Sequence, residues 1–384
     1  MNLNLFSETT DDIAVDFPTS YQQIIERINR INPIQYSKTR NFINGAVTYL
    51  SPYISRGVIS VKQLMDAVLQ KGYKPYQIEK FLQELAWREY FQRVWQHAGD
   101  KIRNDIKHPQ PDVQHHQMIA GIENAATGIE AIDKAIKHLY RSGFMHNHVR
   151  MYTASLACNM AKAHWLQPSK WMYYHLLDGD IASNNCSWQW VAAAFASKKY
   201  YFNQENVNKY TFSKQQHSFL DKSYEEIIAM PVPENLQAIN ELYLQTILPA
   251  TESPVLDTGK PTLIYNAYNL DVLWRKEEDV NRLLLLEPSH FKKYPVSEKV
   301  IQFVIGLSEN INGLTIYTGE ISDIVNQYSK SFVEGGGSII SKEHPAFTHY
   351  PGVKDSRDWM FPEVTGYHPS FFSYWKKCEK RLKQ

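Results

Sequence analysis

Residues 177–190 constrain the fold of this chain more than any other part of the sequence. They contain two carboxylates, two adjacent amides and a Trp-x-Trp pair within a short, Trp-bearing stretch. Burying carboxylates and amides costs free energy unless each finds a hydrogen-bond partner, and a core rarely needs so many such groups together. A large planar cofactor with polar edges and sugar hydroxyls would satisfy them. The segment therefore predicts a cofactor site with indole rings packed beside it.

The bulk properties exclude several classes of protein. The 384 residues suffice for two domains or one large one. Cys158, Cys186 and Cys378 lie far apart and form no Cys-x-x-Cys pair, so we expect no disulfide framework and no bound metal. Residues 1–17 are acidic and do not resemble a signal peptide, and no apolar stretch is long enough to span a membrane. The predicted location is cytoplasmic, without membrane contact.

The charge is divided unevenly along the chain. Residues 1–200 carry 22 Lys and Arg against 17 Asp and Glu, although the whole chain has a net charge of only +1. This basic half is also rich in aromatic residues. Such a composition is compatible with a polyanionic partner such as nucleic acid, but it does not establish one.

Hydrophobic spacing predicts that residues 20–200 are mostly helical. Apolar residues recur at helical intervals in residues 81–91 and 129–139, and small residues continue the pattern after Met151. Residues 103–128 have little periodicity and are predicted to form a loop. His115 and His116 in this loop are either a solvated pair or a metal site, and we expect the former. The polar run 203–221 and residues 249–261 are predicted to be connectors.

The character of the sequence changes after these connectors. Short apolar runs of strand length alternate with helix candidates, and this pattern predicts a small parallel sheet. The last forty residues, rich in aromatics and Pro, are expected to fold back onto the rest. The predicted strands are 262–266, 283–286, 314–318 and 338–341, the last after a turn at Gly335–Gly337, and the predicted helices are 296–307 and 320–329.

Four blocks together resemble the flavin-binding helical domain of the DNA photolyase and cryptochrome family. They are residues 48–60, 81–91, 143–151 and 177–190, in the family's order and spacing. The resemblance implies a mostly α fold, with a photolyase-type FAD-binding helical bundle followed by a small α/β segment. We expect the helical domain at 1–215, a connector at 216–261 and the α/β domain at 262–384.

The resemblance implies FAD as the cofactor and suggests which residues hold it. Arg88 and Arg150 resemble the cations that meet the phosphates and Asp178, while Asp180 resembles a carboxylate near the flavin edge and ribose. Asn184 matches the residue that faces flavin N5, and an Asn there favours repair over signalling. The full set of expected cofactor contacts is Tyr36, Thr48, Leu50, Ser51, Phe81, Arg88, Arg150, Asp178, Asp180, Asn184 and Asn185.

The family's substrate cavity is matched at five positions, and these imply the cyclobutane-dimer type. Glu84 is expected to hydrogen-bond the base edge, Trp87 and Trp190 to stack on the lesion, and Met151 to pack against it, with Asn147 completing the set. The (6–4) photolyases have two histidines where this chain has Asn147 and Met151. The neighbouring His146 and His148 are expected to be structural.

Trp188 and Trp165 match the first two members of the family's electron relay. Residues 96–164 contain no Trp, so the third member is either a Tyr or absent. Tyr49 and Phe81 also stand where family members often have Arg and Trp. Backbone contacts to DNA are expected from Arg150, Lys198, Lys199, Lys209 and Lys214.

The implied function is light-driven, FAD-dependent repair of cyclobutane pyrimidine dimers in DNA, by electron transfer from reduced flavin. The enzyme class is deoxyribodipyrimidine photolyase, acting as a monomer. Two alternatives remain: a cryptochrome-like photoreceptor without repair, and a flavin-binding subunit that needs a separate antenna-domain partner. Family members begin with an α/β antenna domain, whereas this chain begins almost at the flavin domain. Residues 255–384 are therefore hypothesised to replace that domain by circular permutation, with no antenna chromophore assigned.

Overall fold

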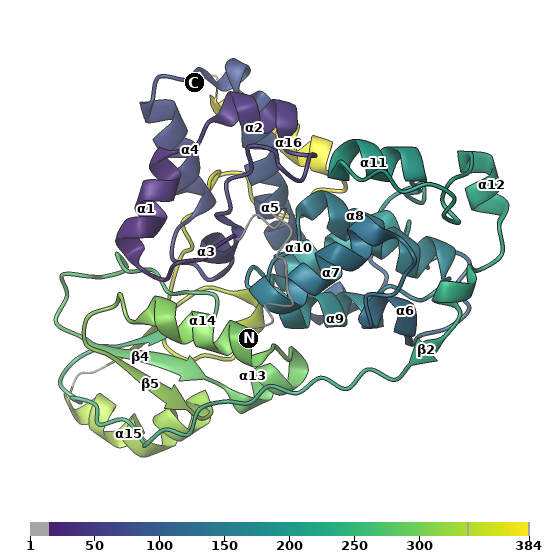
Figure 1. The fold of residues 1–384 in the computed structure, drawn as a ribbon. Coiled ribbons are helices and arrows are strands. Elements are labelled where there is room, and N and C mark those ends of the chain that lie inside the picture. The colour runs from purple at the N-terminus through teal and green to yellow at the C-terminus, as the bar shows by residue number, and fades with distance from the viewer. Residues whose placement is uncertain (1–14, 336–337, 383–384) are drawn as a thin grey trace, which may run out of the picture.

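The computed structural model describes residues 15–335 and 338–382. It combines a helical part, purple to teal in Figure 1, with a parallel sheet drawn in green. The helices predicted over residues 81–91 and 129–139 are present within α5 and α7. The helical part comprises α1 (Tyr21–Asn29), α2 (Pro33–Thr39), α3 (Ser51–Ser55), α4 (Val61–Gln70), α5 (Glu79–Ala98), α6 (Ala120–Glu123), α7 (Glu130–Ser142), α8 (Asn147–Ser155), α9 (Leu166–His175), α10 (Ile181–Val191), α11 (Gln204–Thr211) and α12 (Tyr224–Ala229).

Two helix ends place residues 177–180 in the structure. Gly143 ends α7 with φ +72°, and a Cβ there would lie 2.6 Å from Cγ of Leu177. The backbone N–H of Leu177 donates to the carbonyl of Gly143 at 2.8 Å. Asp180 then caps α10, its carboxylate accepting from the backbone N–H of Ser183 at 2.7 Å. The turn between these anchors is therefore fixed at both ends.

The predicted parallel sheet is confirmed. Its strands lie in the order β5-β4-β3-β6-β7, and every neighbouring pair is parallel. Strands of two or three residues, namely β7 and the antiparallel pair β1–β2, were not predicted because they are too short for a sequence period to show. The elements are β1 (Met118–Ile119), β2 (Ile239–Asn240), β3 (Thr262–Tyr265), β4 (Asn281–Leu286), α13 (Pro288–Lys293), α14 (Glu298–Ser308), β5 (Leu314–Thr318), α15 (Ile321–Gly335), β6 (Ile339–Lys342), β7 (Val353–Asp355) and α16 (Phe371–Leu382).

Two predicted connectors contain short helices that were not expected. The polar run 203–221 contains α11, whose first turn is capped by the side chain of Asn203. The range 216–261 contains α12, begun by a capping box at Ser223. Both helices were missed because they are short and bury few side chains, so their hydrophobic period is weak. Gly335 ends α15, and the rest of the turn predicted at Gly335–Gly337 lies outside the described residues.

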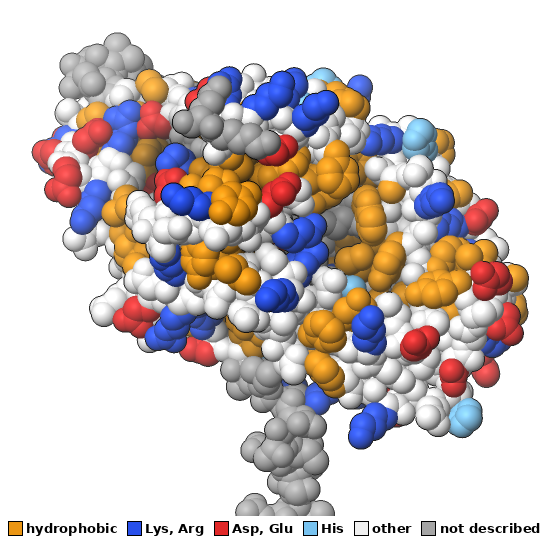
Figure 2. Space-filling view, turned by 90° about the horizontal axis from the view of Figure 1, so that it is seen from above, with side chains coloured by type: hydrophobic (Ala, Val, Ile, Leu, Met, Phe, Trp, Pro, Cys, Tyr) orange, Lys and Arg blue, Asp and Glu red, His pale blue; other side chains and the backbone are white. Residues whose placement is uncertain are grey.

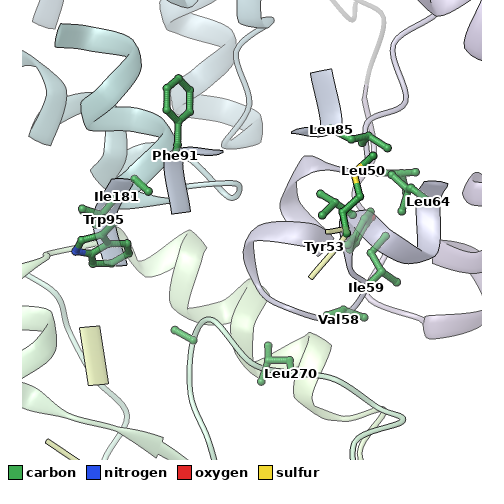
Figure 3. Packing of buried hydrophobic residues seen from close by; sticks show 14 of the residues in the cluster. Leu50, Tyr53, Val58, Ile59, Leu64, Leu85, Phe91, Trp95, Ile181 and Leu270 are labelled. Carbon is green, nitrogen blue, oxygen red and sulfur yellow. The ribbon is translucent and has the colours of Figure 1, made fainter. Parts of the chain in front are cut away.

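The hydrophobic core joins the sheet to the first helices. One cluster contains side chains from α1, α4 and α5 together with one face of the sheet, α14 and α16. Figure 3 shows members from distant parts of the chain: Tyr53 in α3, Trp95 in α5 and Leu270 after β3. A second cluster lies among α6 to α9, and a third lies between the sheet's other face and α15. Within the described residues, no helix is both long and apolar enough to cross a bilayer.

Candidate functional site

Asp178 and Arg150 form the ion pair at the centre of the candidate site. One guanidinium nitrogen, Nη2, donates to both carboxylate oxygens of Asp178, at 3.0 and 2.9 Å. Nε of Arg150 donates to the carbonyl of Met145 at 2.8 Å, which fixes the guanidinium plane. The Asp178 side chain is only 5% exposed, so the pair is largely shielded from water. The predicted pairing of Arg150 with Asp178 is therefore present.

A polar network around Asp180 links three elements beside this pair. Besides capping α10, its carboxylate accepts from Nε2 of Gln92 at 2.6 Å and lies 3.9 Å from Nη2 of Arg88. Arg88 donates to Oγ of Ser55 at 2.7 Å, and that hydroxyl donates to the carbonyl of Asp178, also at 2.7 Å. A continuous polar network thus connects α3, α5 and the start of α10.

The first turn of α10 presents polar atoms that the protein leaves unsatisfied. The amide Nδ2 of Asn184 donates to the carbonyl of Ser169 at 3.0 Å and to the side-chain oxygen of Asn185 at 3.3 Å. This orientation leaves the Asn184 amide oxygen without a donor among the described residues. Oγ of Ser183 is buried and likewise has no hydrogen-bond partner there. A buried polar atom without a partner is costly, so Oγ of Ser183 favours a polar ligand at this turn, and the half-buried Asn184 offers a free amide oxygen to the same ligand.

The expected cofactor contacts that precede α4, namely Tyr36, Thr48, Leu50 and Ser51, are only partly suited to side-chain contact. Tyr36 packs edge-on against Phe81, with ring centroids 5.2 Å apart. Thr48 and Ser51 are half-buried before and at the start of α3. Leu50 is fully buried in the core, so any contact from this residue has to come from its backbone.

His146 and His148 are neutral at physiological pH. Burial is the main cause that lowers the pKa of each to about 4, aided at His146 by the charges of His148 and Arg150 and at His148 by Arg40. Nδ1 of His146 accepts from the backbone N–H of His148 at 3.2 Å, at the start of α8. Neither imidazole therefore supplies a cation to the site.

The five positions matched to the substrate cavity lie on three helices. Glu84 and Trp87 are on α5, Asn147 and Met151 on α8, and Trp190 on α10, which packs against both other helices (Figure 1). Glu84 is paired with Nε of Arg40 at 3.2 Å and Nζ of Lys80 at 3.1 Å. Asn147 is exposed, and Met151 is half-buried.

The indoles assigned to electron transfer are buried, and one has an acidic partner that the sequence did not suggest. Trp188 is 2% exposed and Trp165 is completely buried. Nε1 of Trp165 donates to Asp105 at 2.7 Å, and the same carboxylate lies 3.3 Å from Nε2 of His164. Asp105 lies in the predicted loop 103–128, where no local pattern distinguishes it. The third member of the relay, expected to be a Tyr or absent, stays a prediction.

Two neighbouring lysines among the four expected to contact DNA, Lys198 and Lys199, differ in their environment. Lys198 is exposed, whereas Nζ of Lys199 is 2.7 Å from Asp112 and its side chain is only 10% exposed. Arg150 is engaged by Asp178. Figure 2 looks onto the side where α2, α11 and α16 lie in Figure 1, and it shows Lys and Arg among hydrophobic side chains near the centre of that face. Lys198 therefore remains the better placed of the two for a phosphate.

A cavity of about 130 Å³ lies behind the polar network, between the helices and the carboxyl ends of β3, β6 and β7. The helical part contributes Ser55, Arg88 and Asp180, and the C-terminal part contributes Asn269, Lys342 and Arg357. Nη1 of Arg357 donates to Oε1 of Gln92 at 2.6 Å, and burial lowers the pKa of Arg357 to about 10. Sequence reasoning missed these C-terminal residues because only the tertiary fold brings them to Asp180.

The comparisons with known proteins agree with this geometry. The sequence pattern of the FAD binding domain of DNA photolyase matches residues 81–248. A deoxyribodipyrimidine photo-lyase from Alkalihalophilus pseudofirmus is 30% identical over 172 residues, covering 44% of this chain and 36% of that protein. A deoxyribodipyrimidine photo-lyase from Vibrio cholerae is 28% identical over 200 residues, covering 49% of this chain and 42% of that protein. The chain thus spans less than half the length of these relatives.

Among solved structures, a cryptochrome from Synechocystis aligns with 51% of this chain and 44% of its own, at 24% identity and a TM-score of 0.46. The donor set described above also fits a flavin dinucleotide: guanidinium groups for phosphates, and carboxylate and amide oxygens for ring N–H groups and sugar hydroxyls. Arg88, Arg150, Asp178, Asp180 and Asn184 all fall within the matched segment. Residues 81–248 of this chain therefore match the FAD binding domain of DNA photolyase, and the cofactor is FAD.

Proposed function

We propose that this protein repairs cyclobutane pyrimidine dimers in DNA in a light-driven, FAD-dependent reaction. The observation that carries the proposal is the contrast among its tryptophans. Trp95, Trp165 and Trp188 are at most 2% exposed, whereas Trp190 is 38% exposed and Trp87 is only partly buried. A flipped-out, flat and largely apolar lesion needs accessible aromatic rings to stack on, and α5 and α10 carry these two indoles on helices in contact.

The other matched residues supply polar contacts to the same lesion. Glu84 is a hydrogen-bond acceptor for a base N–H, and its pairing with Arg40 and Lys80 restrains the carboxylate. Asn147, exposed at the start of α8, offers both a donor and an acceptor to the base edge. Met151, one turn further along α8, adds an adaptable apolar contact.

Arg88, Arg150, Asp178, Asp180 and Asn184 are the residues proposed to hold FAD. FAD, when bound and reduced, supplies the light-excited electron that opens the dimer. The protein's own contribution is positioning: the Arg150–Asp178 pair and the Asp180 network are fixed before any ligand arrives. Such preorganisation reduces the entropy lost when cofactor and lesion are brought into contact.

The test is blue-light repair of a thymine dimer in a short oligonucleotide, with the bound flavin chemically reduced beforehand. We expect several dimers to be restored per protein in the light and none in the dark. Glu84→Gln should reduce the repair rate, whereas Glu130→Gln, at an exposed position on α7, should not. Stable flavin binding without repair would contradict the proposal and favour a light-sensing role, or a requirement for a partner.

We also propose the division into residues 1–215, 216–261 and 262–384, with the last part standing in for an antenna domain. Support comes from its parallel sheet, whose carboxyl edge faces Asp180 across the cavity. Cytoplasmic location, monomeric state and DNA as partner remain predictions. Limited proteolysis checks the division, since cleavage confined to 216–261 is expected and early cleavage within α14 would contradict it.

A further inference from the structure

The indole of Trp87 is covered on one face by a ring from the end of the chain. Phe371, the first residue of α16, stacks on it with centroids 3.8 Å apart and ring planes 10° from parallel. Phe371 is only 2% exposed, whereas Trp87 keeps part of its surface accessible. Because an aromatic ring has two faces, this stack leaves a single face of Trp87 for a ligand.

The helix that carries Phe371 is fixed to α5 next to Trp87. The hydroxyl of Tyr374 donates to Glu89 at 2.6 Å, and Glu89 also accepts from the backbone N–H of Phe361 at 3.0 Å. Glu89 is 2% exposed, so these bonds form in a shielded environment. The hydroxyl of Tyr90 donates to the carbonyl of His368 at 3.2 Å, just before α16. Phe371 therefore has little freedom to leave the stack.

Two further aromatic rings, from the same helix α5, restrict the orientation of the Trp87 indole. Tyr90 lies edge-on at 5.9 Å between centroids, and Phe91 is tilted at 5.4 Å. Together with Phe371 they hold the indole in one orientation before any ligand binds. A rigid, preorganised aromatic surface loses less entropy on binding than a mobile one.

We propose that Phe371 is a positioning residue that orients Trp87 as one wall of the lesion pocket. The inference rests on the proposed function. It adds α16 to a lesion pocket whose other residues all lie before position 200. Discrimination between damaged and undamaged DNA then depends on a residue that does not itself face the substrate.

The experiment measures equilibrium binding in the dark, for an oligonucleotide with one thymine dimer and for the same sequence undamaged. Phe371→Ala should lower the ratio of the two affinities by about threefold to tenfold, the range expected for loss of one aromatic pair. Phe371→Tyr should restore the ratio because it keeps the ring. The matched control is Tyr243→Ala, which removes an aromatic ring that is 90% exposed outside α16 and should leave the ratio unchanged.

Two further variants keep the test decisive. Phe371→Leu fills the space without a planar ring, so a folded Phe371→Leu protein with wild-type discrimination would overturn the inference, even if Phe371→Ala fails to fold. Trp87→Ala distinguishes a failure of this inference from a failure of the proposed repair function. If Trp87→Ala leaves discrimination intact, the proposed function is contradicted at this residue; if Trp87→Ala abolishes it and Phe371→Leu does not, only the role of Phe371 is wrong.

Discussion

At the scale of single residues, the site is built from charges whose partners are already in place. Arg150 and Asp178 satisfy each other within a largely buried turn, while Asp180 serves at once as a helix cap and as an acceptor for Gln92. Removing one partner of such a pair leaves an unpaired charge in a shielded environment, which costs far more than losing an exposed pair.

Arg150→Ala is therefore expected to lower the free energy of unfolding by about 3 kcal/mol, and to reduce the amount of flavin that copurifies with the protein. Denaturant titration and flavin absorbance measure the two effects. The matched control is Arg30→Ala, which removes an exposed pair with Glu26 in which the arginine side chain is 78% exposed. A similar loss of stability in both variants would contradict the importance assigned to the buried pair.

His146 and His148 predict a specific dependence of stability on pH. Their pKa values are lowered to about 4 in the folded protein, so between pH 6.5 and 4 the unfolded chain binds protons that the folded chain does not. The free energy of unfolding should therefore be maintained above pH 6.5 and fall as the pH decreases below it. His146→Gln combined with His148→Gln should flatten this decline in denaturant titrations at pH 7, 6 and 5, and an unchanged slope would contradict the prediction.

At the scale of elements, the ends of helices decide where the functional side chains lie. α7 ends at Gly143, where the side chain of Leu177 packs against the end of the helix. The backbone N–H of Leu177 also donates to the carbonyl of Gly143, and this contact positions the turn that carries Asp178. Any other residue at position 143 is disfavoured for two reasons. The backbone φ is positive, and a Cβ would clash with the side chain of Leu177.

Gly143→Ala should thus destabilise the protein by more than the roughly 1–2 kcal/mol expected from the left-handed conformation alone, and it should weaken flavin binding by shifting Asp178. Gly72→Ala provides the comparison, since Gly72 has φ +89° and no atom within 4 Å of the position of a Cβ. Thermal melts and flavin titration distinguish the two. Equal effects on flavin affinity would show that the close approach of Leu177 does not position the site.

At the scale of the whole molecule, the sheet and the first helices share one core. The buried side chain of Arg56 connects this core to the candidate site by hydrogen bonds. Arg56 is 1% exposed, and Nε donates to the carbonyl of Leu177 at 3.0 Å while Nη1 donates to that of Ala267 at 3.4 Å. It also donates to Leu176 at 3.5 Å, at the C-terminal end of α9, where a cation is favoured. One side chain therefore joins three segments.

We expect the sheet and the first helices, which share this core, to unfold together, and Arg56→Met to lower the free energy of unfolding by about 3 kcal/mol or more. Loss of these bonds should also separate the transition followed by tryptophan fluorescence from that followed by far-UV circular dichroism. Lys62→Met, at a half-exposed pair with Asp66, is the control and should keep the transitions coincident. Separate transitions already in the unaltered protein would contradict the single core.

Sequence reasoning was most successful where a pattern repeats or a motif is dense. Residues 81–91 predicted α5 because apolar spacing reports the buried face of a helix directly, and residues 177–190 predicted a polar site because so many costly groups stand together. α11 and α12 were missed because short helices with few buried positions carry too weak a period. The functional assignments of Glu84, Trp87, Asn147, Met151 and Trp190 remain predictions.

The sequence by itself determined the helical half and the parallel sheet through periodicity, and it indicated a cofactor site through local polar density, since both are properties of neighbouring residues. Its resemblance to the photolyase and cryptochrome family implied that the cofactor is FAD. Only the tertiary structure decided that Asn269 and Arg357 border the cavity at Asp180, that Asp105 binds Trp165, and that Phe371 covers one face of Trp87. Those contacts join residues tens to hundreds of positions apart. They depend on how the cores of the sheet and the helices merge, and no local pattern in the chain records that.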